Sequence, residues 1–173
     1  MKQSIIIFGL IIGAILSINM VYMVNLCYNN PDFKSNDVVG YTAMIVMFSL
    51  IYFGIRNYRD KELAGVISFG RAFKTGILIA LVGSTIYVVA WLFYYYLVVP
   101  DFIDVFIPHI LKEAADKGPA ELASKTKEMA EFKEMYKNPL FVVLITYAEV
   151  FPIGFVVALI SSAILKKKAE TTE

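Results

Sequence analysis

The sequence predicts an all-α integral membrane protein, a four-helix bundle with an amphipathic helical hairpin between its third and fourth spans. The chain of 173 residues is 58% apolar, against roughly 45–50% in a soluble domain. Its mean hydropathy is +0.65. Four apolar runs are separated by the charged stretches, and about 20 apolar residues suffice to cross a hydrocarbon layer of about 30 Å. We therefore treat the chain as a single membrane domain covering residues 1–173.

The predicted spans cover residues 4–28, 38–55, 72–98 and 139–165. The first is too long for the core of a signal peptide, and we expect it to be retained as a transmembrane helix. It carries small residues every fourth position, at Gly9, Gly13 and Ser17. Such a stripe lets another helix approach closely, either within the chain or from a second copy. The third span repeats the pattern at 76, 80 and 84.

Basic residues beside the spans predict the orientation. Lys and Arg near span ends are retained on the cytoplasmic side of a membrane. A hinge at 56–71 joins the second and third spans, and the fourth span ends in three lysines. The residues expected to set the topology are Arg56, Arg59, Lys61, Arg71, Lys74, Lys166, Lys167 and Lys168. This predicts a multi-pass protein of the bacterial inner membrane with both termini in the cytoplasm.

Residues 100–138 form the one large segment outside the spans. They divide at Gly118-Pro119 into two amphipathic helical patterns, and we expect Pro108 to interrupt and bend the first. The segment has eight acidic residues and six lysines. Trp91 and Tyr94–Tyr96, near the end of the third span, indicate a membrane interface. The segment is interpreted as a helical hairpin over the outer face, either a solvated cap or a docking surface.

Glu149 is the residue that breaks the apolar pattern of the fourth span. It follows Pro139 by ten residues, which places it about 15 Å deep at about 1.5 Å per residue. A charged group there costs a few kcal/mol, so we expect it to be protonated or partnered. Pro152, three residues on, frees a helical carbonyl and permits a kink.

We hypothesise that a buried polar site forms around this acid. Polar side chains at similar depth in the other spans are Ser17, Asn19, Ser49, Ser84 and Thr85, with Thr146 one turn before the acid. The candidate intramembrane site comprises Glu149, Pro152, Asn19, Ser84, Thr85 and Thr146. Three roles stay open for it: hydrogen bonds that lock the helices together, a relay for protons or cations, and contact with a partner subunit.

Other chemistry has little support in the sequence. His109 and Glu113 are four residues apart, a possible two-ligand face for a metal, but no third ligand is evident. Cys27 is interpreted as a small apolar filler. No phosphate-binding loop, Ser/His/Asp set or HExxH motif is present. We expect no enzymatic activity, catalytic residue, metal or cofactor, and the net charge of +1 gives no reason to expect nucleic acid.

Four stretches carry a family resemblance. They are GIRNYRD at 54–60, ISFGRAFK at 67–74, FKE at 132–134 with YKNP at 136–139, and EVFP at 149–152. With these motifs the chain resembles the bacterial membrane family called domain of unknown function 4199, over nearly its whole length. The resemblance implies a four-span bacterial membrane protein and no activity.

The leading functional hypothesis is a non-enzymatic accessory or structural subunit of an inner-membrane assembly. Its surroundings would be the lipid bilayer together with a membrane-protein partner or further copies of the chain. The alternative is a small transporter or a proton- or cation-coupled channel that uses Glu149. Alternating-access transporters generally contain paired repeats, and we find none in these 173 residues.

Overall fold

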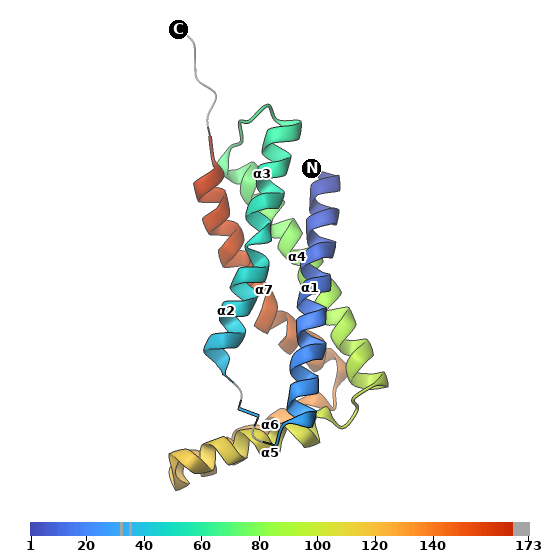
Figure 1. The fold of residues 1–173 in the computed structure, drawn as a ribbon, viewed down its shortest axis with the longest axis vertical. Coiled ribbons are helices and arrows are strands. Elements are labelled where there is room, and N and C mark those ends of the chain that lie inside the picture. Colours follow the sequence, from blue (N-terminus) through green and yellow to red (C-terminus); the bar gives the residue numbers. More distant parts are fainter. Residues whose placement is uncertain (32, 35, 168–173) are drawn as a thin grey trace.

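The computed structural model describes residues 1–31, 33–34 and 36–167. It confirms the all-α fold class, with four helical stretches long and apolar enough to cross a membrane (Figure 1). The helices in the described residues are α1 (Lys2–Asn29), α2 (Asp37–Phe48), α3 (Leu50–Glu62), α4 (Phe69–Leu97), α5 (Phe102–Lys117), α6 (Pro119–Tyr136) and α7 (Pro139–Leu165). The four membrane-crossing stretches are α1, α2 with α3, α4 and α7.

The second span is longer than its apolar run and is broken in the middle. Helix α2 ends at Phe48 and α3 starts at Leu50, with Ser49 between them. The hydroxyl of Ser49 donates to the carbonyl of Val46 at 2.6 Å. Helix α3 then continues to Glu62, so the first part of the expected 56–71 hinge is helical, and α4 starts at Phe69, before the expected 72. Arg, Lys and Glu are good helix formers, so the helix outlasts the hydropathy that marked the span.

Glycines bring α1 and α4 together. A Cβ added to Gly9 would lie 2.5 Å from Cγ1 of Val82, and one added to Gly13 would lie 2.6 Å from Cβ of Ile86. Contacts this short leave no room for a side chain, so the helix backbones approach closely at both positions. The two helices run in the same direction, because Gly9 meets Val82 and Gly13, one turn later in α1, meets Ile86, one turn later in α4. The small-residue stripe of α1 thus packs within the chain.

Another side of α4 packs against α7 through small residues. A Cβ on Gly76 would lie 3.0 Å from Cβ of Ala158, and one on Gly154 would lie 2.9 Å from Cβ of Ala80. The earlier residue of α4, Gly76, meets the later residue of α7, Ala158, so the two helices are antiparallel. Helix α4 therefore has α1 on one side and α7 on another.

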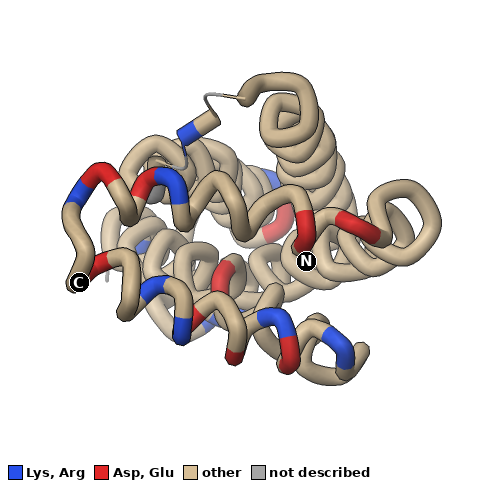
Figure 2. The backbone as a smooth tube through the Cα atoms, turned by 90° about the horizontal axis from the view of Figure 1, so that it is seen from below, with Lys and Arg blue, Asp and Glu red and all other residues tan. Residues whose placement is uncertain are grey.

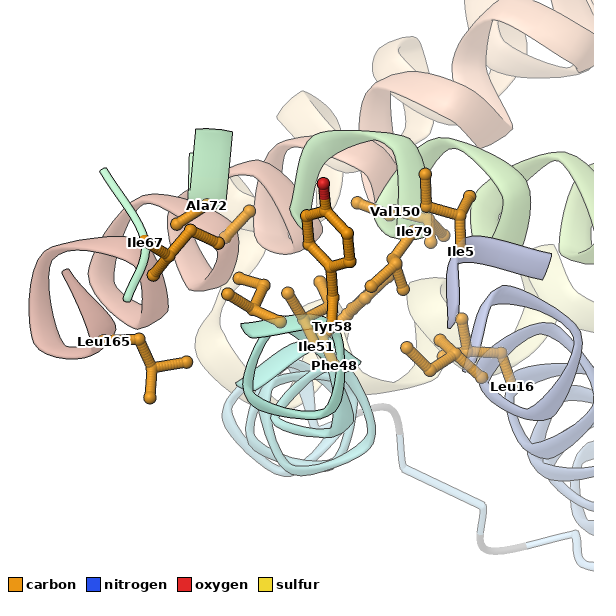
Figure 3. Close-up of a cluster of buried hydrophobic side chains, with 14 residues drawn as sticks. Ile5, Leu16, Phe48, Ile51, Tyr58, Ile67, Ala72, Ile79, Val150 and Leu165 are labelled. Carbon is orange, nitrogen blue, oxygen red and sulfur yellow. The ribbon is translucent and has the colours of Figure 1, made fainter. Parts of the chain in front are cut away.

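The main core fills the space between these helices. Side chains from α1, α2, α3, α4 and α7 meet in one cluster (Figure 3). Phe48, Ile51, Ile79 and Val150 are fully buried within it. A Cβ on Gly154 would lie 2.9 Å from the ring of Phe48, so this glycine also makes space for the largest of them.

One end of the bundle collects the N-terminus, the α3–α4 connection and the end of α7 (Figure 1). The ammonium group of Met1 pairs with Glu62. Ile67 and Lys167 exchange two backbone hydrogen bonds, of 3.1 and 2.9 Å. The expected basic residues therefore gather at a single end, with the exception of Lys168, which lies outside the described residues.

Helices α5 and α6 form a hairpin across the other end of the bundle (Figure 1). Figure 2, viewed from this end, shows acidic and basic residues along both helices. Gly118, with φ of +119°, makes the turn between them, a conformation that L side chains rarely adopt. Helix α5 runs without interruption through Pro108, contrary to the expected break. The loss of one backbone donor does not stop a helix of 16 residues.

The hairpin is joined to the bundle by polar contacts. The hydroxyl of Tyr28, at the end of α1, donates to Asp101 at 2.8 Å. In the α1–α2 connection, Lys34 pairs with Asp116 of α5 at 3.6 Å. These contacts are exposed ion pairs and hydrogen bonds, which contribute about 0–1 kcal/mol each.

Replacing Gly13 by Val tests the α1–α4 contact. The added side chain meets Ile86, and overpacking of this kind costs about 1–3 kcal/mol, so we expect a lower midpoint of thermal unfolding in detergent. The matched control is Gly40→Ala in α2, where an added Cβ meets nothing within 4 Å. That variant should be as stable as the parent or more so by about 0.5–1 kcal/mol. Equal melting of both variants would show that α1 and α4 do not approach closely.

Candidate functional site

Glu149 lies in an unbroken part of α7, which continues through Pro152 to Leu165. Its depth, about 15 Å from the start of the helix, is as expected from the sequence. Its side chain, however, is exposed on the surface of the chain. The expectation of a buried acid is therefore wrong for the single chain. Spacing along a helix gives the depth of a residue, whereas the direction of its side chain depends on which neighbours the helix packs against.

Four of the expected polar side chains donate hydrogen bonds within their own helices. The hydroxyls of Ser17, Thr85 and Thr146 each donate at 2.7 Å to the carbonyl oxygen four residues earlier, as Ser49 does to the one three earlier. A hydroxyl has one proton, so none of the four donates to Glu149. Ser and Thr side chains in apolar helices commonly donate to a carbonyl of their own helix in this way. The prediction considered only their depth in the membrane and left these local bonds out.

The remaining predicted residues lie at separate places. Ser84 is fully buried in α4, and within the described part of the chain its hydroxyl has no hydrogen-bonding partner. Asn19 is half-buried on α1, and Pro152 is exposed. Thr85 is exposed and accepts a hydrogen bond of 2.7 Å from the hydroxyl of Tyr147, which joins α4 to α7.

Two neighbours of Glu149 are tyrosines that the sequence argument left out. The carboxylate acts electrostatically on the hydroxyls of Tyr87 in α4 and Tyr136 in α6. Tyr136 is 8% exposed and belongs to a second apolar cluster with Trp91 and Tyr95. The rings of Tyr95 and Tyr136 meet edge to face, with centroids 5.5 Å apart. The acid thus lies at the edge of an aromatic cluster formed where the hairpin docks on the bundle.

Tyr136 inserts its hydroxyl between α4 and α7. Its polar neighbours are the indole of Trp91 and the side chain of Thr146. Burial raises the pKa of Tyr136 to about 12, the indole of Trp91 acts against this shift, and the negative charge of Glu149 adds to it. The hydroxyl therefore stays neutral at physiological pH, and it can donate a hydrogen bond but not serve as an anion.

One signal in the sequence could have identified Tyr136. It is the last residue of α6, and only Lys137 and Asn138 separate it from α7. The side chain of Asn138 accepts a hydrogen bond of 3.0 Å from the N–H of Leu140 and so caps α7. A turn this short forces the end of α6 against the start of the fourth span, so an aromatic residue at that position must contact the bundle.

Two hollows lie elsewhere on the chain. A cleft of about 150 Å³ under the hairpin is lined by Phe33, Lys34, His109, Lys112, Glu113 and Asp116. In it, Glu113 pairs with Lys117 at 3.0 Å, and no three His, Cys, Asp or Glu side chains within the described residues could hold a metal ion. A groove of about 360 Å³ lies between α2–α3 and α7, and its lining is almost entirely apolar. Cys27 is buried.

Residues 7–167 match the family model described as "Protein of unknown function (DUF4199)". The chain belongs to this family. No curated protein and no solved structure matches it. The resemblance drawn from its motifs is thereby confirmed, and the four apolar helices are consistent with a multi-pass membrane protein.

The pKa of Tyr136 predicts how the hairpin responds to pH. The docked hairpin favours the neutral form of Tyr136. This contribution to docking is therefore fully present below the ordinary tyrosine pKa of 10, and it is lost as the pH rises through about 12. The chain has a single Trp, Trp91, whose emission should shift to longer wavelength across this interval.

Because the chain has 11 tyrosines, the matched control is Tyr136→Phe, which keeps the ring but cannot ionise. Its emission should stay constant over the same interval of pH. An identical shift in both proteins would assign the effect to other groups.

Proposed function

We propose that this protein is a non-enzymatic accessory or structural subunit of an assembly in the bacterial inner membrane. The observation that supports this most directly is the exposure of Glu149 in the apolar helix α7. Acidic residues within spans almost always face the interior of a bundle or a water-filled cavity, because exposure to hydrocarbon costs a few kcal/mol. A second protein surface against α7 would remove that cost.

The surrounding surface supports the same proposal. Along its length, α7 also exposes Leu144, Val156 and Ile160, by 54%, 51% and 54%. Lipid covers such apolar side chains equally well, so they alone carry no argument for a partner. The exposed acidic side chain among them does, because acidic residues within spans almost always face protein or water.

The alternative of a small transporter or channel would require a water path to Glu149. The groove beside α7 is almost entirely apolar, and the cleft under the hairpin does not include this residue. Further chains would have to complete a water path to Glu149, so a transport function would also require association of several chains.

We propose that the end of the bundle that carries Met1 and the last residues of α7 faces the cytoplasm. Arg56, Arg59, Lys61, Arg71, Lys74, Lys166 and Lys167 lie at this end, close to the spans. At the other end most charges lie on α5 and α6, further from the spans, where the positive-inside rule gives them less weight.

Cysteine labelling in intact cells tests the orientation. A cysteine at Lys127 on α6 should react with a membrane-impermeant maleimide, and a cysteine at Lys61 should react only after lysis. Cys27 is 2% exposed, so the parent chain supplies the background. The reverse pattern would place the termini outside.

Purification in mild detergent from native membranes tests the function. We expect a particle heavier than one chain of 19.5 kDa plus its detergent, with defined stoichiometry. A stable monomer, both in detergent and after cross-linking in the membrane, would contradict the role of a subunit. Flux of protons or cations in liposomes, abolished by Glu149→Gln, would move the function to transport.

A further inference from the structure

Four exposed basic side chains gather at the end of the bundle that carries Met1. Arg71 and Lys74 lie in the first two turns of α4, and Lys166 and Lys167 directly follow α7 (Figure 1). Within the described part of the chain, none of these four side chains forms an ion pair. We call these four residues the basic rim.

The acidic residues of this end are paired with other groups. Asp60 pairs with Arg59 at 2.7 Å, and Glu62 pairs with the ammonium group of Met1. Helices α3 and α4 and the connection between them contain no further acid, and α7 contains none after Glu149. In the described residues, the charge of the basic rim is therefore not balanced by carboxylates.

The lysines of the hairpin differ from those of the rim. Lys117, Lys125, Lys133 and Lys137 each pair with a carboxylate of α5 or α6. Exposed lysines of this chain thus find carboxylates where the sequence supplies them nearby. At the rim the sequence supplies none, so a complementary anion has to come from outside the described chain.

Contacts of the backbone hold the two halves of the rim at one end of the bundle. Ile67, two residues before α4, forms its two backbone hydrogen bonds with Lys167. A guanidinium N–H of Arg59 in α3 donates to the carbonyl oxygen of Leu165 at 3.4 Å. The end of α7 is therefore fixed beside the connection that leads into α4. Like charges collected in this way repel each other, and an anion placed among them lowers the free energy of the folded chain.

Apolar rings begin next to the rim. Phe69, the first residue of α4, is 39% exposed and stacks on Phe73 with ring centroids 5.7 Å apart. Phe73 in turn meets Phe155 of α7 edge to face at 5.5 Å. A positive rim that borders an apolar surface matches the order of groups in a phospholipid, in which the phosphate lies just outside the acyl chains.

We propose that the basic rim binds the headgroup phosphates of anionic phospholipids. Lys and Arg near the end of a span extend their charged groups to the headgroup level while their stems stay against apolar surface. Their N–H groups form charge-assisted hydrogen bonds with phosphate oxygens. A zwitterionic headgroup carries its own cation and gains less from the rim, so the preference is for net negative lipids. This inference goes beyond the role as a subunit and does not depend on it.

Native mass spectrometry of the purified chain tests the preference. The chain is reconstituted in bilayers with equal amounts of phosphatidylglycerol and phosphatidylcholine, and the lipids that stay bound after extraction in mild detergent are identified. We expect phosphatidylglycerol to be retained over phosphatidylcholine, and the preference to weaken as the concentration of NaCl is raised.

Thermal unfolding in detergent separates a lipid from free phosphate. Phosphatidylglycerol should raise the midpoint of unfolding, because it binds the folded chain. Inorganic phosphate at the same concentration should not, because it has no acyl chains to contact the apolar surface beside the rim. An equal rise with both would overturn the assignment to a lipid.

Charge variants locate the site. Lys166→Gln/Lys167→Gln should lower the preference for phosphatidylglycerol, by about fivefold for each charge removed. The matched control is Lys127→Gln/Lys137→Gln, which removes two charges from the hairpin end and should leave the preference unchanged. Lys166→Arg/Lys167→Arg keeps the charge and should keep the preference, which separates loss of charge from a disturbance of the fold.

The second half of the rim should respond in the same way, so Arg71→Gln/Lys74→Gln should also lower the preference. Equal retention of the two lipids by the parent chain would overturn the inference without any variant. A preference that survives in both rim variants would overturn it as well, because the responsible charge would lie elsewhere. A monomer in the membrane that keeps a rim-dependent preference would contradict the role as a subunit and leave this inference standing.

Discussion

The close approach of α4 to two helices at once is the constraint on which the rest of the bundle depends. Gly9 and Gly13 of α1 admit side chains of α4, and Gly154 of α7 lies against Ala80. In lipid, helices gain little from burying apolar surface, so close van der Waals contact must supply the association. Small residues at these positions make that contact possible. The placement of α3 follows, because its buried Ile51 and Ile55 fill the space that remains.

The sequence predicted the spans well because the bilayer restricts the possible structures. A run of apolar residues in lipid must be helical, since its backbone groups have no other partner. For the same reason the fourth helix begins and ends at the expected residues, 139 and 165. The limits of the second span were less predictable. Its helix continues to Glu62 through charged residues that lie beyond the apolar run, and hydropathy cannot register that extension.

The sequence predicted the depth of the candidate site residues in the membrane, but not the directions in which their side chains point. Thr85 and Thr146 lie near the level of Glu149, yet both donate to their own helices. One residue near the acid, Tyr136, comes from outside the spans. Its position depends on how the hairpin folds back over the end of the bundle. A comparison of depths between spans contains no information about that fold-back.

The antiparallel contact of α4 with α7 also affects the order in which the chain assembles during synthesis. Helix α1 can pair with α4 as soon as α4 has entered the membrane, because both partners then exist. The face of α4 that carries Gly76 and Ala80 must wait until α5, α6 and α7 have been made. During this interval the newborn chain holds an incomplete core in lipid. The translation time of residues 98–165 therefore sets a minimum period in which chaperones and membrane proteases can act on it.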